Sequence, residues 1–396
     1  MGVFFDWASL FQKDPRLWTP AELVPEEERD EDQRRAAKLY RESRSETQDE
    51  AMKLALGTLD LWYAHSKTTV VLLTELPEKL PDSFDKKRTY ESRGWTTYER
   101  CSAELCKTFR LQQAGWPLVV DLGKQRAALR RLPTTPERME ELFQKCSFTN
   151  GADKDKVLEK YKKTARAVLG GVKELSFFGI PFDPTDPWRS PERFGQALNL
   201  CVNLKKLDLS FTGLTDEHLA SISGVLSSSA LPQLEQLFLG LNRLGPGGIE
   251  ALGSALVSGV ASSLKTLILP GNDFGDAGLK SFAALMAMGM AHELQLVYLV
   301  GNDFGDAGAF ALADAVRLRL ASGECKVGTI FLFSFNHVGM RGRLALSAAV
   351  KPDFLQFLTS FLTNTPYPRG VIEGCKRTLR HEAYSYLHAE YRHTRD

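Results

Sequence analysis

The sequence LKTLILPGNDFGDAG at residues 264–278 is followed by LQLVYLVGNDFGDAG at residues 294–308. The last eight letters of the two stretches are identical. In both stretches apolar residues occupy the first, fourth and sixth positions, and an Asn follows three residues after the last of them. A match at a constant step of this length predicts one structural unit that is stacked on copies of itself.

The same spacing continues on both sides of these two copies. Upstream copies are Leu204-x-x-Leu207-x-Leu209 and Leu234-x-x-Leu237-x-Leu239, and a degenerate one is Val172-x-x-Leu175-x-Phe177. A last copy, Phe331-x-Phe333-x-x-Asn336, follows after a step of 34 residues. The pattern therefore predicts about six units, over residues 171–350.

Each unit contains the signals of a strand, a turn and a helix. The alternating apolar residues predict a short strand, and an Asn side chain is able to hold the following turn by bonding to backbone groups. Apolar residues then recur four apart at the same place in successive units, as expected for one buried helix face: Leu252 and Leu256, Phe282 and Met286, Leu312 and Val316. One unit cannot bury its apolar face alone, so the units must stack, with the strands in a parallel sheet.

This repeat, of about 28–30 residues with a full helix, resembles the ribonuclease-inhibitor-like subclass of leucine-rich repeats. The resemblance implies a curved solenoid with strands on the concave side and helices on the convex side. The four Asp residues of the two identical octapeptides, Asp273, Asp276, Asp303 and Asp306, lack the ligand spacing of a calcium-binding EF-hand loop. We expect them to act as turn and helix-cap residues.

Strand alternation also predicts which side chains face solvent on the concave side. The central outward position of successive strands holds Asp208, Phe238, Ile268, Tyr298 and Leu332, and the next outward position holds Ser210, Gly240, Pro270, Val300 and Ser334. Apolar residues that are contiguous on an exposed sheet face usually mark an interaction site. The sequence therefore predicts a protein partner here, with cover by another part of the same chain as the alternative.

Residues 1–170 have a different pattern, in which strands and helices alternate without a repeat. Expected strands are Val3–Phe5, a fully buried Thr68–Thr74 and Pro117–Leu122, and expected helices are 46–63, 92–112, 136–145 and 153–169. Such alternation predicts an α/β domain with a parallel sheet. The whole chain is thus expected to be an α/β protein: this domain, the β/α solenoid and a helical cap or docking tail at 351–396.

The segment YESRGWTTYER at residues 90–100 suggests chemistry for this domain. A buried strand, a loop and then Tyr90, Ser92, Trp95 and Glu99 at the start of a helix resemble the corresponding stretch of Toll/interleukin-receptor (TIR) domains. The resemblance implies that Glu99 is the catalytic residue of an NAD⁺ glycohydrolase, with Tyr90, Ser92 and Trp95 lining its substrate pocket. Trp95 and Glu99 lie one helical turn apart. In the alternative interpretation, Trp95 belongs to the core, Glu99 is a solvated or capping acid and the domain is inert.

Composition limits the other functions. Fifty basic and 49 acidic side chains give a net charge of +1, which argues against a nucleic-acid binder. Cysteines and histidines show no metal-ligand spacing, and no run of residues is apolar enough to span a membrane. We expect reduced thiols, no bound metal or cofactor, and a cytoplasmic location by default, with a longer precursor chain as the alternative. The functional hypotheses are a protein-binding scaffold, an NAD⁺ glycohydrolase that uses the repeats as its sensor, and a structural subunit of a large complex.

Overall fold

The computed structural model describes residues 24–43, 45–65, 68–72, 74, 79, 89–107, 119–121, 131–148, 151–226, 231–257, 263–289, 293–321, 330–332 and 336–349. The chain divides into two compact units, Met1–Tyr63 and Ala64–Asp396. Each unit is described by itself. The expected strand Val3–Phe5 and the expected tail 351–396 lie outside the described residues.

In the first unit, the 3-10 turn η3 (Glu26–Glu28) precedes the helix α2 (Glu31–Arg41). A capping box starts α2: Asp30 accepts a bond from the Gln33 amide at 2.7 Å, and Gln33 accepts one from the Asp30 amide at 3.1 Å. The helix α3 (Glu46–Ala64) follows and ends at the start of the second unit.

The second unit begins with an α/β region. Its elements are β1 (Val70–Leu72), the 3-10 turn η4 (Tyr90–Ser92), α4 (Gly94–Ala103), β2 (Val119–Asp121), α5 (Pro136–Phe143) and α6 (Asp153–Gly171). The strands β1 and β2 pair in parallel, with Val70 opposite Val119, so the predicted parallel pairing is confirmed.

Two details of this region correct the expectations from sequence. The strand β1 was expected to be fully buried, but its central residue, Val71, is 55 % exposed, because only alternate side chains of the strand face the core. The helix expected to run to residue 112 ends at Ala103, and a turn follows. This turn brings the buried Lys107 to the chain before β1, where its ammonium group donates to the carbonyl oxygens of His65 at 2.9 Å and Thr68 at 2.6 Å.

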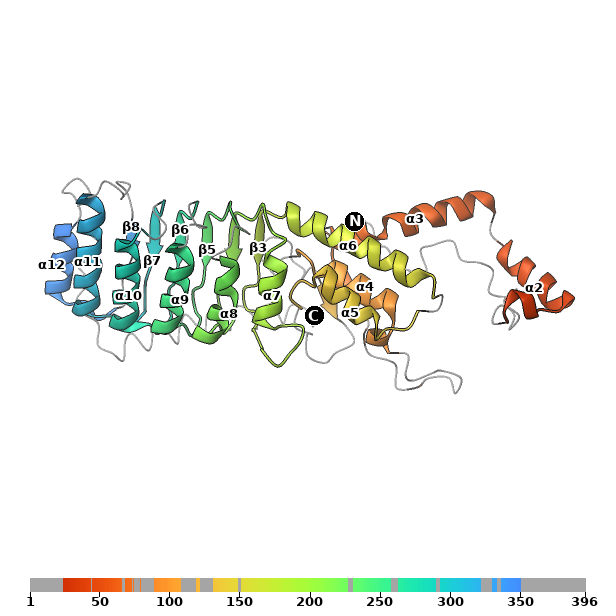
Figure 1. Ribbon diagram of the computed structural model, residues 1–396, viewed down its shortest axis with the longest axis horizontal. Coiled ribbons are helices and arrows are strands. Elements are labelled where there is room, and N and C mark those ends of the chain that lie inside the picture. The colour runs from red at the N-terminus through yellow and green to blue at the C-terminus, as the bar shows by residue number, and fades with distance from the viewer. Residues whose placement is uncertain are drawn as a thin grey trace. The chain divides into compact units, whose positions relative to one another are not determined.

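The repeats form a solenoid in which a strand alternates with a helix (Figure 1). The strands are β3 (Glu174–Ser176), β4 (Lys206–Asp208), β5 (Gln236–Phe238), β6 (Thr266–Ile268), β7 (Leu296–Tyr298) and β8 (Ile330–Leu332). The helices are α7 (Pro191–Leu198), α8 (Asp216–Leu226), α9 (Pro246–Val257), α10 (Gly275–Ala287), α11 (Asp306–Ala321) and α12 (Met340–Ala349). Within the described residues, the strands form one six-stranded parallel sheet in sequence order.

The solenoid core is made by the inward strand residues and the predicted helix positions. Leu207, Leu237, Leu267 and Val297 pair with one another across the sheet and are fully buried. The helix residues named above, from Leu252 to Val316, are also buried, so the predicted inward register is confirmed. The core continues from the repeats into the α/β region through residues such as Tyr161 and Tyr98.

Candidate functional site

A ladder of buried Asn side chains fixes the turn after each strand. The amide nitrogen of Asn272 donates to the carbonyl oxygens of Leu269 at 3.0 Å and, one repeat earlier, Leu239 at 3.1 Å, and its oxygen accepts from the Leu244 amide at 3.1 Å. Asn242, Asn302 and Asn336 bridge repeats in the same way. These bonds satisfy backbone groups that the strand ends leave buried, so the predicted turn role of the Asn residues is confirmed.

Asp side chains form a second set of bonds between repeats, and the expected helix-cap role is confirmed for Asp276 and Asp306, although the capped helix belongs to the following repeat. The Asp276 carboxylate accepts from the amides of Gly305 at 2.8 Å and Gly308 at 2.7 Å, both at the start of the next helix. Asp306 accepts in the same way from the amides of Gly339 and Gly342. Each acid therefore caps the helix of the following repeat, where unsatisfied amides and the helix dipole favour negative charge.

The predicted concave surface contains a row of half-buried apolar side chains. Phe238, Ile268 and Tyr298 occupy facing positions on the adjacent strands β5, β6 and β7, and each retains exposed area. On the neighbouring strand, the Lys206 ammonium group lies 5.2 Å from the centroid of the Phe238 ring. The side chain of Leu332, the last member of the predicted row, lies outside the described residues. We call Phe238, Ile268 and Tyr298 the concave row.

Asp208 departs from the prediction that it faces solvent. The residue is 2 % exposed, and its carboxylate accepts bonds from the Ser176 hydroxyl at 3.3 Å and from the Ser210 amide at 3.1 Å. The next predicted outward position is also largely covered, since Ser210 is 8 % and Val300 is 7 % exposed. The concave row is therefore a narrow strip rather than a broad face.

Beside this strip, two apolar residues adopt a backbone conformation that favours glycine. Phe211 has φ 57° and Leu241 has φ 56°, whereas the equivalent positions of the next two repeats hold Gly271 and Gly301 at φ 68° and 69°. A side chain in this left-handed region carries a steric cost. The ring of Phe211 packs 6.0 Å from that of Phe178, which extends the apolar surface toward the first repeat.

The residues of the TIR-like prediction lie around the start of α4. The half-buried Trp95 packs edge-on to Tyr98, with ring centroids 6.0 Å apart, and its indole nitrogen donates to Asp153 at 3.4 Å. The Ser92 hydroxyl donates to the Thr89 carbonyl oxygen at 3.0 Å and so closes the η4 turn. Burial raises the pKa of Tyr90 well above its usual value, and the nearby charge of Glu99 raises it further. Trp95 thus has a structural environment, with an aromatic neighbour and a hydrogen-bond partner.

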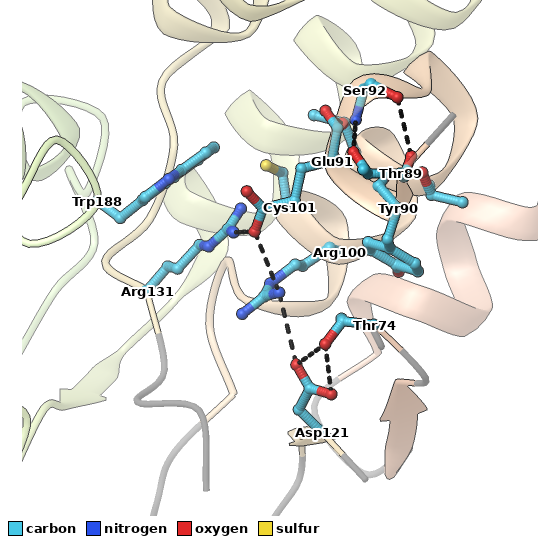
Figure 2. A network of polar contacts seen from close by, with 12 residues as sticks. Thr74, Thr89, Tyr90, Glu91, Ser92, Arg100, Cys101, Asp121, Arg131 and Trp188 are labelled. Atoms are coloured by element: carbon cyan, nitrogen blue, oxygen red, sulfur yellow. Dashed lines mark hydrogen bonds and ion pairs between the residues drawn. The ribbon is translucent and has the colours of Figure 1, made fainter. Parts of the chain in front are cut away.

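A buried charge network that the sequence did not predict lies next to these residues (Figure 2). Arg100 is 3 % exposed, and its guanidinium lies 3.6 Å from Glu104, 3.7 Å from Asp121 and 3.9 Å from Glu91. Within the described residues, its Nε and Nη1 atoms are close to these carboxylates but make no hydrogen bond. Asp121, at the end of β2, also accepts two bonds from the Thr74 hydroxyl, at 2.8 and 2.7 Å.

The network continues through Arg131 to the first repeat. Arg131 pairs with Glu91, and its guanidinium carbon lies 3.7 Å above the Trp188 ring, between β3 and α7. The Leu132 amide also donates to the Trp188 carbonyl oxygen at 3.0 Å. Cation–π stacking of this kind is strongest when the guanidinium is removed from water, and Arg131 is 7 % exposed. The network therefore ties the α/β region to the start of the solenoid.

Comparison with known proteins identifies the repeats. A family model described as Leucine Rich repeat matches residues 200–223, 260–283 and 294–313. No curated protein matches the chain. The matched residues, the parallel sheet and the strand–helix alternation show that the C-terminal half contains leucine-rich repeats. Such repeats generally present extended concave surfaces to other proteins, which supports a binding role. Within the described part of the chain, no helix is long and apolar enough to cross a membrane.

Proposed function

We propose that this chain is a protein-binding module or scaffold that captures its partner on the concave surface of a ribonuclease-inhibitor-like solenoid. The observation that supports the proposal is the concave row, in which three apolar side chains on adjacent strands keep exposed area although they do not contribute to the core. Buried aromatic anchors dominate the energetics of protein interfaces, and Phe238 and Tyr298 are placed to act as such anchors.

The shape of the row favours an apolar segment over a broad surface as its ligand. The row is flanked on one side by the buried Ser210 and Val300. The other flank is half-buried and mostly polar, with Lys206, Gln236, Thr266 and the apolar Leu296. A partner that inserts a few apolar side chains would bury the row and leave the flanking polar groups solvated. This arrangement of an apolar centre and a polar rim is usual in protein interfaces.

The test is the double variant Phe238→Ser with Tyr298→Ser, compared in affinity capture with the unchanged chain. We expect its capture of the specific partner to fall at least tenfold, while the melting temperature stays close to that of the unchanged chain. A matched control removes two exposed apolar side chains elsewhere on the repeats, Val202→Ser with Met288→Ser. Equal capture by the concave variant and the unchanged chain would refute the proposal, and unfolding of that variant would refute the strand register on which it rests.

A second candidate function is a TIR-like NAD⁺ glycohydrolase with the repeats as its sensor, for which NAD⁺ would be the substrate. The supporting observation is that α4, which carries Trp95 and Glu99 one turn apart, begins directly after the η4 turn that holds Tyr90 and Ser92, and that the charge of Glu99 raises the pKa of Tyr90. NAD⁺ turnover, measured on the free protein and on protein crowded onto beads, tests this function. Turnover that disappears in Glu99→Ala would support it, and its absence in both formats from folded protein would oppose it.

The third hypothesis is a structural subunit of a larger complex. It differs from the first in the stability that it predicts for the purified protein. A subunit of this kind would aggregate or unfold when purified alone, because its docking surfaces remain uncovered. A monomeric protein that unfolds reversibly would favour the scaffold.

A further inference from the structure

One position of the repeat, just beyond the carboxyl end of each strand, has a left-handed backbone. Its amide bonds to the following repeat: Phe211 donates to the Gly240 carbonyl oxygen at 2.9 Å, and Leu241 donates to that of Pro270 at 2.7 Å. The backbone angle φ lies between 56° and 74° in each of the five repeats in which this position is described. Glycine adopts this conformation without steric cost, and it occupies the position in the first, fourth and fifth repeats, as Gly179, Gly271 and Gly301.

Phe211 and Leu241, in the second and third repeats, are the exceptions to this use of glycine. A bulky side chain on a left-handed backbone is rare and carries a steric cost. The fold does not require a side chain at this position, because glycine serves in the other three repeats. Both side chains are half-buried, unlike the fully buried core residues Leu209 and Leu239. A local rule that is broken at a cost is expected at functional positions.

These two residues belong to an apolar edge that begins in the first repeat. The Phe211 ring packs against the half-buried Phe178, with centroids 6.0 Å apart, and Leu241 occupies the same position one repeat later. Leu241 in turn lies over Gly271, where an added Cβ atom would come within 2.9 Å of the Leu241 Cδ2 atom. Glycine at 271 therefore leaves room for the Leu241 side chain. We call Phe178, Phe211 and Leu241 the strand-end ledge.

The strand-end ledge and the concave row occupy complementary parts of the concave surface. The ledge belongs to the first three repeats, and in the first two of them the mid-strand position holds the buried polar residues Ser176 and Asp208. The concave row belongs to the third, fourth and fifth repeats, and in the last two of them the strand-end position is glycine. Large apolar side chains therefore run diagonally across the sheet, and the third repeat contributes both Leu241 and Phe238. With strands about 4.8 Å apart, five strands span roughly 19 Å.

The edge of the sheet at which the strands begin carries an excess of positive charge. The Lys206 ammonium group lies 5.2 Å from the Phe238 ring centroid. Glu235 is shared by two lysines, Lys205 and Lys265, each 3.1 Å from one of its oxygens. Along this edge four lysines are opposed by two glutamates: Lys173, Lys205, Lys206 and Lys265 against Glu174 and Glu235. A partner with acidic residues on the flank above this edge would complement its charge.

We propose, resting on the function proposed above, that the strand-end ledge and the concave row form one diagonal site for an amphipathic helix of another protein, with acids on the flank that meets the lysines. The strands β4 to β7 are paired on both sides, so they offer a partner side chains rather than backbone groups. A helix presents apolar side chains once per turn of about 5.4 Å, close to the strand spacing of about 4.8 Å. Successive turns of the helix therefore meet successive repeats.

Thermal unfolding of the double variant Phe211→Gly with Leu241→Gly tests the role of the ledge in the fold. The variant removes two partly exposed side chains and their steric cost, so we expect a melting temperature within about 3 °C of that of the unchanged chain, or above it. Leu209→Ala with Leu239→Ala, which truncates two inward neighbours, should lower it by more than about 10 °C. A comparable fall in the glycine variant would overturn the proposal, because the two side chains would then hold the fold.

Fluorescence anisotropy tests the binding of a labelled helical peptide of about 18 residues, roughly 27 Å long. The peptide carries leucines on one face, glutamates along one flank and glutamines elsewhere. We expect the unchanged chain to bind it, and the glycine variant to bind it about tenfold more weakly. The same peptide with lysine in place of each glutamate should also bind about tenfold more weakly. The control variant Val202→Ser with Met288→Ser should bind like the unchanged chain.

Absence of binding to the glutamate peptide would overturn the proposal, as would equal binding by the glycine variant or of the lysine peptide. Binding that is lost in the Phe238/Tyr298 variant but not in the glycine variant would confine the site to the concave row and leave the proposed function intact. If the Phe238/Tyr298 variant still captures the specific partner, the proposed function itself fails. A dimer in light scattering that the glycine variant does not form would also overturn the proposal and identify a second copy of the chain as the occupant.

Discussion

The repeats and the α/β region bury polar groups in two different ways. In the repeats, one neutral amide per unit, such as Asn272, bonds to its own turn and to the turn before it, so the same solution recurs along the solenoid. In the α/β region, charged groups from several elements collect around Arg100. A neutral buried group is satisfied by hydrogen bonds alone, whereas a buried charge also needs an opposite charge. The two regions should therefore respond differently when one polar side chain is removed.

The largest effect is expected from Asn272→Ala. The substitution removes three hydrogen bonds and leaves the buried Leu244 amide without its partner, while the carbonyl oxygens of Leu239 and Leu269 keep the bonds from Asn242 and Asn302. At about 1–3 kcal/mol for the unsatisfied amide and about 0.5–1.5 kcal/mol for each of the other two bonds, the free energy of unfolding should fall by roughly 2–6 kcal/mol, measured by urea denaturation. Asn199→Ala is the control, because its amide makes a single bond of 3.4 Å and should cost less than about 1 kcal/mol. Similar losses in both variants would show that the ladder is not what holds the turns.

In the α/β region, Arg100→Met should cost about 3–5 kcal/mol, because it leaves Glu104 and Asp121 buried beside each other without the guanidinium. Adding Glu104→Gln and Asp121→Asn to this variant should recover part of the loss, since neutral groups of the same shape need no counter-charge. No similar rescue is available to Asn272→Ala, in which no charge is left unpaired. Failure of the rescue would mean that Arg100 acts through packing rather than charge.

The same difference explains how far the sequence could predict the structure. The inward residues of the solenoid, such as Leu267, follow from the constant step alone. The bonds that join one repeat to the next could not be predicted in this way. Asp276 bonds to amides 29 and 32 residues later in the chain, whereas its position in the sequence suggests a cap of its own helix. Asp208 was misjudged for the same reason, since its burial depends on the neighbouring strand.

The α/β region was less predictable because its interactions have no period. The Arg100 network joins Glu91, Asp121 and Arg131 from separate elements, and no spacing in the sequence indicates that they meet. The helix α4 could be predicted, but not its end at Ala103 or the turn after it, where Lys107 bonds to backbone before β1. The prediction that Tyr90 and Glu99 belong to one site came from a family resemblance. No pattern in the sequence itself requires these two residues to interact.

The cysteines of the two regions offer a comparison by pH. Burial raises the pKa of Cys101, in the α/β region, to about 11 and that of Cys201, in the first repeats, to about 12, from an ordinary value of 9.0. Both thiols hold their protons more tightly in the folded protein. The contribution of each protonated thiol to the free energy of unfolding is therefore complete below pH 9. It is lost as the pH rises through about 11 for Cys101 and about 12 for Cys201.

Between pH 8 and pH 10, each thiol should lower the free energy of unfolding by about 1.4 kcal/mol. Cys101→Ala and Cys201→Ala should therefore each reduce the alkaline fall in unfolding free energy by this amount, measured by urea denaturation at the two pH values. Only Cys101 has charged neighbours, Arg131 among them, whose positive charge lowers its pKa. Arg131→Met should thus slow alkylation of Cys101 at pH 9 without changing that of Cys201. An equal decrease in the alkylation rates of both thiols would indicate that the substitution changes the unfolding that exposes them rather than the pKa of Cys101.

The smallest effect concerns a break in the regularity of the repeats themselves. Asp216 accepts from the Gly245 amide, and Asp276 and Asp306 cap the helices after them, but the equivalent position on α9 holds Pro246. The amides of Gly275 and Gly278 at the start of α10 donate to the carbonyl oxygens of Asn302 and Phe274 instead. Pro246→Asp should therefore gain from the helix dipole alone and make the protein about 0.5 kcal/mol more stable than Pro246→Ala, in which the restricted backbone of Pro is also lost. This difference should shrink in high salt, because a charge at a helix start is screened. Equal stability of the two variants would mean that a charge at the start of α10 adds nothing to these backbone bonds, and that the acid is a replaceable part of the repeat while the buried Asn is not.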